Sequence, residues 1–253
     1  MKRTWTLLLL ALLTISTFTA QAEVLRLAGN VWPPYTDQRL PGGGLSVELV
    51  RTALGRAGYQ VDYIEVPWER ALLGLRYGRY DLVNAWPASG RMEYGSYSRP
   101  FLTNRVRWIR RRDQHIAYSG RDSLIPYRIG LVRGYAYSEA LEHDARLNKG
   151  YAANFVQLAK MLGAGRIDLT LEDERTVLFH LHRELRDLQD AYRFVPGAFS
   201  LLDLSLVVRT DHPQREEILA TFNREIEAML ADGSYAEIFH RHGLPAPVSL
   251  PQP

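Results

Sequence analysis

Strand-like and helix-like segments alternate along the first half of this chain, and this alternation is the strongest constraint on its fold. Strands are expected over 24–28, 61–66 and 81–85, with amphipathic helices over 45–57 and 68–77 between them. Apolar residues at helical spacing indicate the helices, and short apolar runs bounded by turn residues indicate the strands. Strands separated by helices form parallel sheets with helices on their faces, so we predict an α/β protein.

The same alternation restarts after a polar stretch at 112–123, which follows an extended-looking segment at 96–112. The second series consists of strands expected over 128–132, near Phe155 and over 167–171, and of helices expected over 139–143, 157–163 and 174–184. A strand over 204–208 and a long helix over 215–230 follow. A chain of 253 residues can bury two cores, so two α/β lobes are predicted.

The first 22 residues have the three parts of a secretory signal peptide. Lys2 and Arg3 form a basic start, an apolar run covers 7–13, and an Ala-x-Ala site ends at Ala22. The apolar run is too short to span a bilayer. Cleavage after Ala22 changes the count from 31 basic and 28 acidic residues to 29 and 28, so the net charge falls from +3 to +1. We expect a soluble periplasmic protein that does not bind nucleic acid.

The sequence lacks the residues and motifs that several classes of enzyme and metal site require. The chain has no cysteine, which excludes disulfides, a cysteine nucleophile, thiolate metal sites and a lipoprotein anchor at the cleavage site. Glycine-rich nucleotide-binding motifs, the serine-hydrolase elbow and the His-Glu-x-x-His zinc motif are also absent. The histidines at 180 and 182, and at 240 and 242, lie two residues apart, so on a helix they point in different directions. We expect no catalytic residues, no metal and no cofactor.

Arg91 follows the strand expected over 81–85, where the carboxyl ends of strands open a crevice in an α/β lobe. Its planar guanidinium can bind a carboxylate through two hydrogen bonds, and Ser89 with nearby backbone amides can add donors. The alternative is a surface arginine in an arginine-rich chain. Position alone favours the surface arginine.

Asp173 stands at the corresponding edge of the second lobe, two residues after the strand expected over 167–171. A carboxylate at this edge can bind an ammonium group. Aspartate also caps helix N-termini, and a helix is expected from 174. Both roles can hold together.

Five aromatic side chains stand where expected strands meet loops: Trp32, Tyr35, Trp68, Trp86 and, in the second lobe, Tyr135. Core packing explains any one of them. Several at such edges together fit the wall of a cleft that encloses an apolar or cationic group of a ligand.

Six segments carry a resemblance to a known family: Trp32-Pro33-Pro34-Tyr35, 44–49, Leu75 to Asp81 with its Gly78-Arg79, Arg91, 97–101, and Gly165 to Asp173. In their order and spacing they resemble the family 3 periplasmic solute-binding proteins, the polar amino-acid-binding components of ABC transporters. The likeness covers nearly the whole mature chain. It implies a two-lobed periplasmic-binding-protein fold of type II, with a hinged cleft between α/β lobes joined by two crossing strands.

The resemblance also implies an arrangement and a partner. Lobe 1 would comprise 23–108 and 200–253, and lobe 2 would comprise 109–199. Arg91 would hold the carboxylate of an amino acid or similar small ligand, and Asp173 its ammonium group. The cleft would close over the ligand, and the protein, expected to be a monomer, would deliver it to the membrane permease of an ABC importer.

Two departures leave the ligand open. The segment from Asp81 to Arg91 is two residues shorter than usual and holds Asn84-Ala85-Trp86-Pro87 where small hydroxyl residues are usual, and Gly134-Tyr135-Ala136 replaces Gly-Thr-Thr. The ligand could be an aromatic or unusual amino acid, or another small carboxylate. The same fold also serves periplasmic enzymes such as cyclohexadienyl dehydratases, the binding modules of lytic transglycosylases, and soluble sensors for membrane receptors.

Overall fold

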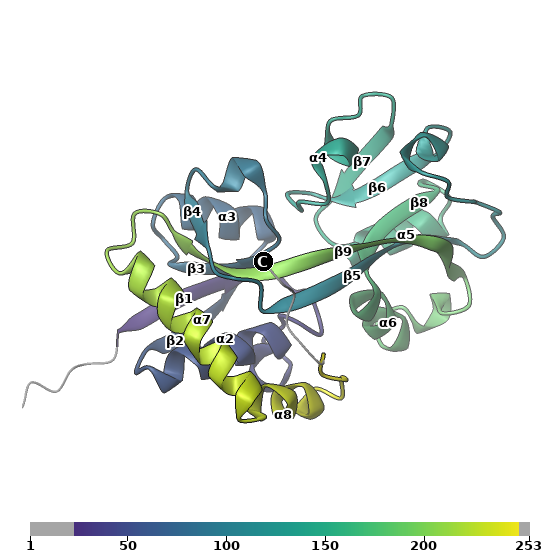
Figure 1. Cartoon of the computed structure of the whole chain (residues 1–253). Coiled ribbons are helices and arrows are strands. Elements are labelled where there is room, and N and C mark those ends of the chain that lie inside the picture. Colours follow the sequence, from purple (N-terminus) through teal and green to yellow (C-terminus); the bar gives the residue numbers. More distant parts are fainter. Residues whose placement is uncertain (1–22, 248–253) are drawn as a thin grey trace, which may run out of the picture.

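The computed structural model describes residues 23–247 and shows two α/β lobes connected by two long strands (Figure 1). The predicted signal peptide, 1–22, lies outside the described residues. The elements of lobe 1 are β1 (Val24–Gly29), α2 (Leu45–Arg56), β2 (Gln60–Glu65), α3 (Trp68–Arg76), β3 (Leu82–Ala85), β4 (Gly95–Tyr97), α7 (Arg215–Ala231) and α8 (Ser234–Arg241). Those of lobe 2 are β6 (Arg128–Val132), α4 (Glu139–Glu142), β7 (Asn148–Ala152), α5 (Phe155–Gly163), β8 (Leu169–Asp173) and α6 (Glu174–His182).

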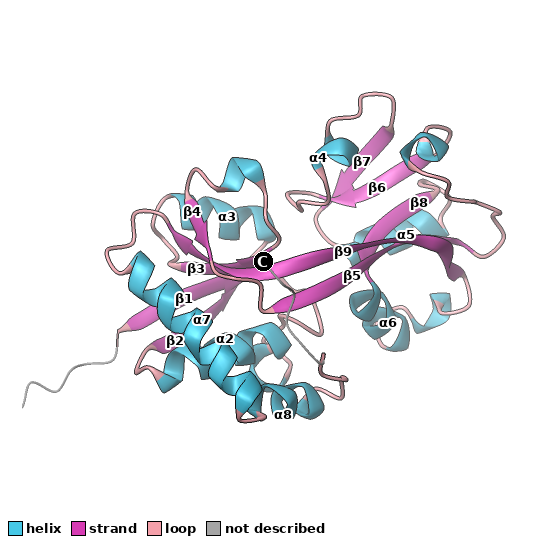
Figure 2. Ribbon diagram, viewed as in Figure 1, coloured by secondary structure: helices cyan, strands magenta, loops and turns pink. Residues whose placement is uncertain are grey.

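The two connecting strands are β5 (Leu102–Arg111) and β9 (Tyr192–Arg209). They pair antiparallel from Leu102 opposite Leu204 to Arg111 opposite Tyr192, and together they run from one lobe into the other (Figure 2). The sheet order is β2-β1-β3-β9-β5-β8-β6-β7, with β4 also beside β9. Within the lobes, β1 is parallel to β2 and β3, and β6 is parallel to β7 and β8.

Alternating side chains of the lobe 1 strands explain its layers. Leu27 and Leu82 belong to the core shared with α2 and α7, while the next residues, Ala28 and Val83, pack with Trp68 of α3. Successive residues of a strand point to opposite faces, so this sheet is buried on both sides by helices (Figure 2). In lobe 2, α5 and α6 supply a separate apolar cluster around the strands.

Most predicted elements are confirmed, with three differences. The last strand begins at Tyr192 rather than near 204, because it crosses from lobe 2 before it enters lobe 1. The strand expected near Phe155 lies slightly earlier, as β7, and Phe155 itself begins α5, because the Asn154 side chain accepts a hydrogen bond from the backbone of Gln157. Helix α8 was not foreseen. The predicted boundaries at 108/109 and 199/200 fall inside β5 and β9, and this division stays a prediction.

Gly44 holds the loop that carries Trp32 and Tyr35. Its φ is +101°, and a Cβ there would lie 2.5 Å from the carbonyl oxygen of Tyr35. We therefore expect Gly44→Ala to lower the free energy of unfolding by roughly 1–3 kcal/mol, measured by urea denaturation. Gly55→Ala is the control: Gly55 is an exposed residue of α2 with nothing near its Cβ position, so alanine should raise stability by about 0.5–1 kcal/mol. Equal effects at both positions would contradict this account.

Candidate functional site

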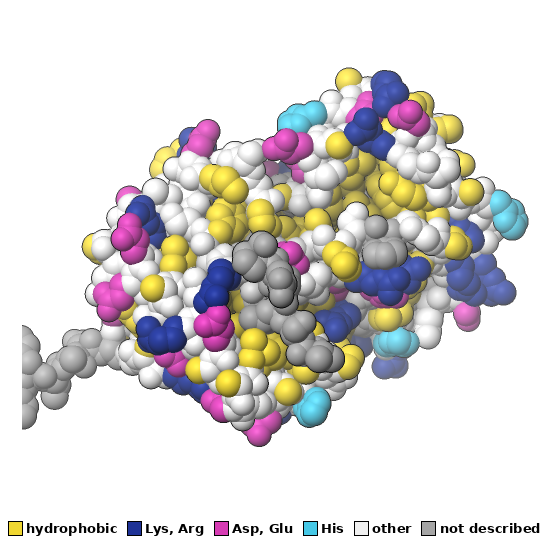
Figure 3. Space-filling model, viewed as in Figure 1, with side chains coloured by type: hydrophobic (Ala, Val, Ile, Leu, Met, Phe, Trp, Pro, Cys, Tyr) yellow, Lys and Arg dark blue, Asp and Glu magenta, His cyan; other side chains and the backbone are white. Residues whose placement is uncertain are grey.

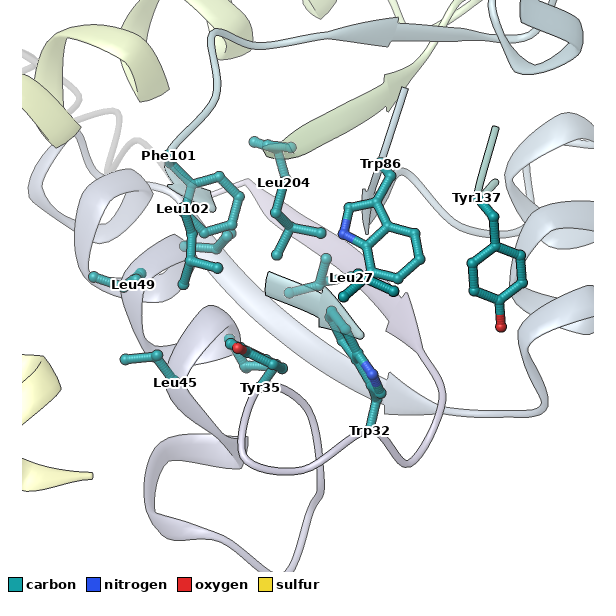
Figure 4. Close-up of a cluster of buried hydrophobic side chains, with 14 of the residues drawn as sticks. Leu27, Trp32, Tyr35, Leu45, Leu49, Trp86, Phe101, Leu102, Tyr137 and Leu204 are labelled. Carbon is teal, nitrogen blue, oxygen red and sulfur yellow. The ribbon is translucent and has the colours of Figure 1, made fainter. Parts of the chain in front are cut away.

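A small cavity lies between the lobes at the carboxyl ends of β1, β3 and β6. Its lining residues are Asn30, Trp32, Trp68, Asn84, Ala85, Trp86, Arg91, Tyr135, Ala136 and Leu204. Its volume is about 30 Å³, enough for one or two water molecules, so a larger ligand requires the lobes to separate. Hydrophobic side chains gather along the hollow between the lobes (Figure 3), and Trp32, Trp86 and Leu204 lie near one another in the close-up (Figure 4).

Four aromatic rings surround this space. Tyr135, from lobe 2, meets three lobe 1 tryptophans edge to face, with ring centres 6.3 Å from Trp32, 6.4 Å from Trp68 and 5.4 Å from Trp86. Trp32 and Trp86 also meet each other at 5.6 Å. Edge-to-face pairs are favourable contacts between rings, so Tyr135 stabilises the approach of the two lobes.

Arg91 brings a positive charge to the cavity wall. It ends the 3₁₀ turn Ser89–Arg91 and is only 5% exposed. One guanidinium nitrogen donates to the carbonyl of Trp86 at 2.6 Å, and the group lies 5.5 Å from the centre of the Trp68 ring. Its Nε has no partner, and among residues 23–247 no carboxylate forms an ion pair with it. A buried guanidinium without an anion is unfavourable, so this group is suited to bind one.

Asp173 is engaged by the protein itself. Its Oδ1 accepts hydrogen bonds from the backbone of Arg175 and Thr176, which caps α6, and from the hydroxyl of Tyr35 at 2.9 Å. Its Oδ2 accepts from Asn104 of β5 at 3.2 Å. The residue is 1% exposed and does not line the cavity. The predicted capping role is confirmed.

Glu172, next to Asp173, is a fully buried carboxyl group that connects the lobes. Its Oε1 accepts from the Trp32 indole nitrogen at 3.0 Å and from the backbone of Asp173 at 2.8 Å, while its Oε2 has no partner. Burial, with a smaller contribution from the charge of Asp173, raises the pKa of Glu172 to about 8. Glu172 is therefore predominantly protonated and uncharged near neutral pH.

Other hydrogen bonds join the lobes around the cavity. The Trp68 indole donates to the carbonyl of Gly134 at 2.8 Å, and the Ser89 hydroxyl donates to Glu139 at 2.7 Å. No group of three or more His, Cys, Asp or Glu side chains within 23–247 could hold a metal ion. In the same range, no helix is long and apolar enough to cross a membrane.

The model of the bacterial extracellular solute-binding proteins, family 3, matches residues 27–245. The chain belongs to this family. A curated relative, the L-cystine-binding protein TcyA of Bacillus subtilis (strain 168), is 24% identical over 203 residues, which are 77% of this chain and 70% of TcyA.

Solved structures share the fold of this family 3 solute-binding protein. A histidine kinase sensor domain with similarity to periplasmic binding proteins has a TM-score of 0.76 at 21% identity, over 89% of this chain and 99% of the sensor domain. An ancestral arginine-binding protein bound to arginine has a TM-score of 0.72 at 19% identity, over 87% and 98% of the two chains. The two-lobed type II fold predicted from the sequence is confirmed.

In this family 3 protein the predicted site residues divide into two groups. Five line the cavity: Trp32, Trp68, Trp86, Arg91 and Tyr135. The other three, Tyr35, Ser89 and Asp173, do not line it. Tyr35 donates a hydrogen bond to Asp173 and Ser89 donates one to Glu139, so both bonds join the two lobes.

The structure adds two polar residues to the cavity, Asn30 and Asn84, which the sequence analysis did not select. The Oδ1 of Asn84 has no partner, while its amide nitrogen lies 3.2 Å from the Ser46 hydroxyl. Their positions at the carboxyl ends of β1 and β3, the same edge that indicated Arg91, were a usable signal.

Asp173→Ala should strongly destabilise the protein. The change removes the cap of α6 and leaves the Tyr35 hydroxyl and the Asn104 amide without an acceptor in a buried place. We expect a loss of about 3 kcal/mol in the free energy of unfolding, measured in urea. Asp187→Ala, at an exposed position, is the control and should change stability by less than about 0.5 kcal/mol. A loss below about 1 kcal/mol for Asp173→Ala would refute the network described above.

Proposed function

We propose that this family 3 solute-binding protein captures an amino acid or similar small carboxylate between its lobes, with Arg91 holding the carboxylate. Trp32, Trp68, Trp86 and Tyr135 enclose the rest of the ligand. The observation that carries the proposal is the buried Arg91 guanidinium, which lines the cavity without an acidic partner within the described residues. The protein binds without converting its ligand, in keeping with a family of binding proteins.

The experiment is isothermal titration calorimetry of the mature protein against the common amino acids and a set of small carboxylates. One ligand per chain should bind, and the binding should make the protein melt at a higher temperature. Failure of every carboxylate, zwitterionic or not, to bind would refute the proposal.

We further propose that the protein works in the periplasm and delivers its ligand to the permease of an ABC importer. The family description as extracellular solute-binding proteins supports an exported protein, and the sequence of 1–22 supports a cleaved signal. Osmotic-shock fractionation should release a chain that begins at Glu23. Recovery of an uncleaved cytoplasmic chain would contradict the proposal.

A sensor role is the second candidate, and it is supported by the likeness to a histidine kinase sensor domain. In that role the closed lobes would report ligand occupancy to a membrane receptor. The genes beside the one for this chain distinguish the two: a permease and an ATPase indicate transport, whereas a kinase indicates sensing. The sensor role uses the same cavity and the same Arg91.

A further inference from the structure

The cavity carries one positive charge and, among its lining residues, no negative one. Arg91 is the cation, and the lining contains two amide side chains and otherwise aromatic or aliphatic groups, but no Asp or Glu. Burial raises the pKa of Tyr135 well above its ordinary value, so its hydroxyl stays neutral. A ligand that balances this charge carries a net charge of −1, whereas an amino-acid zwitterion carries none.

Two buried carboxyl groups, Glu172 and Asp173, stand at the end of β8, and neither lines the cavity. Asp173 accepts four hydrogen bonds from the protein and lies outside the cavity lining. Glu172 accepts two hydrogen bonds through Oε1, and because burial raises its pKa to about 8 it is predominantly neutral at pH 7. The hydrogen-bonding positions of Asp173 are filled by the protein, and the unpartnered Oε2 of Glu172 belongs to a neutral carboxyl group that does not line the cavity. Neither group therefore offers a negative charge to an ammonium group in the cavity.

Aromatic faces can also bind cations, so a tryptophan or tyrosine ring is the other group that could bind an ammonium group here. The ring of Trp68 already lies beside the Arg91 guanidinium, 5.5 Å away. Tyr135 meets all three tryptophans edge to face, at interplanar angles between 77° and 89°. The four rings therefore pack against one another around the space. An ammonium group here would lose its water shell next to a guanidinium and gain no counter-ion, which is strongly unfavourable.

We infer that the ligand is a monocarboxylate with an aromatic or apolar body and without an ammonium group. This inference rests on the proposed function, because it requires Arg91 to hold a carboxylate. The carboxylate neutralises Arg91, and the unpaired Nε and the unpaired Oδ1 of Asn84 provide a donor and an acceptor at the same wall. The body of the ligand lies between Tyr135 and the tryptophans, which are in contact with one another in this structure.

Matched pairs of compounds that differ only in the ammonium group test the inference. The pairs are acetate and glycine, propionate and L-alanine, 3-phenylpropionate and L-phenylalanine, and indole-3-propionate and L-tryptophan, each titrated into the mature protein at pH 7 by calorimetry. In the pairs that bind, the acid without the ammonium group should bind at least about 100-fold more tightly.

The outcomes separate this inference from the proposed function. An amino acid that binds as tightly as its partner acid, or more tightly, overturns the inference and leaves the proposed function intact. If no member of any pair binds and no other carboxylate does, both are overturned. The aromatic acids should also bind more tightly than acetate and propionate. The reverse order would overturn the inference that the ligand has an aromatic or apolar body.

Asp173→Asn provides an independent arm. Asparagine keeps an acceptor for the α6 cap and for Tyr35 but removes the charge. We expect the preference within each pair to stay within about threefold of wild type, since Asp173 does not touch the ligand. A selective loss of amino-acid binding in this variant would assign the ammonium group to Asp173 and overturn the inference. A melting curve verifies that the variant is folded.

Discussion

Arg91→Met is expected to abolish carboxylate binding without lowering the stability of the ligand-free protein. The guanidinium is 5% exposed, it has one hydrogen bond to the Trp86 carbonyl, and its Nε is unpaired. Two charge-assisted hydrogen bonds to a bound carboxylate would be lost in the variant, which corresponds to about 100- to 1,000-fold in affinity.

The stability half of this prediction follows from burial. A buried charge without a counter-ion costs free energy in the ligand-free state, and a methionine of similar length removes that cost while it fills the same space. The melting temperature without ligand should therefore equal or exceed that of wild type, as is common where a functional group is strained or uncompensated.

Calorimetric titration and scanning calorimetry measure the two halves of the Arg91→Met prediction. Arg76→Met is the matched control, because Arg76 is exposed at the end of α3 and lies outside the cavity lining. The control should bind as wild type does. If Arg91→Met binds within about threefold of wild type, or if its ligand-free melting temperature falls by more than a few degrees, Arg91 is a structural residue and the proposed function fails.

Glu172→Gln is expected to stabilise the protein at pH 8 and to flatten the dependence of stability on pH. The pKa of this carboxyl is raised from 4.5 to about 8 by burial. Between these values the folded protein holds a proton that the unfolded chain has released. Stability is therefore lost as pH rises from about 4.5 to 8, with a slope of up to about 1.4 kcal/mol per pH unit.

Glutamine cannot ionise and keeps an acceptor for the Trp32 indole and for the backbone of Asp173. At pH 8 the variant should therefore exceed wild type by roughly 4 kcal/mol, and near pH 4.5 the two should agree. Urea unfolding at pH 5, 6, 7 and 8 measures this difference. Burial lowers the pKa of His180 and of His212, but these groups are common to both proteins and cancel in the comparison.

Glu237→Gln, at an exposed position of α8, is the control for Glu172→Gln and should follow the wild-type curve. Parallel curves for wild type and Glu172→Gln would mean that Glu172 is ionised in the folded protein. That result would also remove one support of the inference that the ligand has no ammonium group.

The crossing strands show where sequence patterns stopped being informative. The end of β9 is recognisable as a strand because the short run from Leu204 to Val208 is apolar except at Ser205. Its first half was not recognised, because it pairs only with a distant segment, β5, and Pro196 and Gly197 interrupt its pattern. Strand pairing between segments far apart in the chain is decided by tertiary structure.

The site residues show the same division. Arg91 and the tryptophans were selected because they stand at strand ends, and parallel strands bring those ends to one edge. The capping role of Asp173 was predictable because capping is a local property. Its hydrogen bonds to Tyr35 and Asn104 were not, because they join residues 138 and 69 positions apart in the chain. Glu172 has no local signal of burial at all: its neighbours in the chain include both charged and apolar residues.

The sequence by itself determined the alternation of strands and helices, the family, and the placement of one arginine and several aromatic residues at a shared edge. These follow from local periodicity and from segments whose order along the chain is preserved. Only the tertiary structure decided which carboxyl groups are free to meet a ligand. Hydrogen bonds and burial across the two lobes occupy Asp173 and neutralise Glu172, and such contacts depend on distances in space that no local pattern encodes.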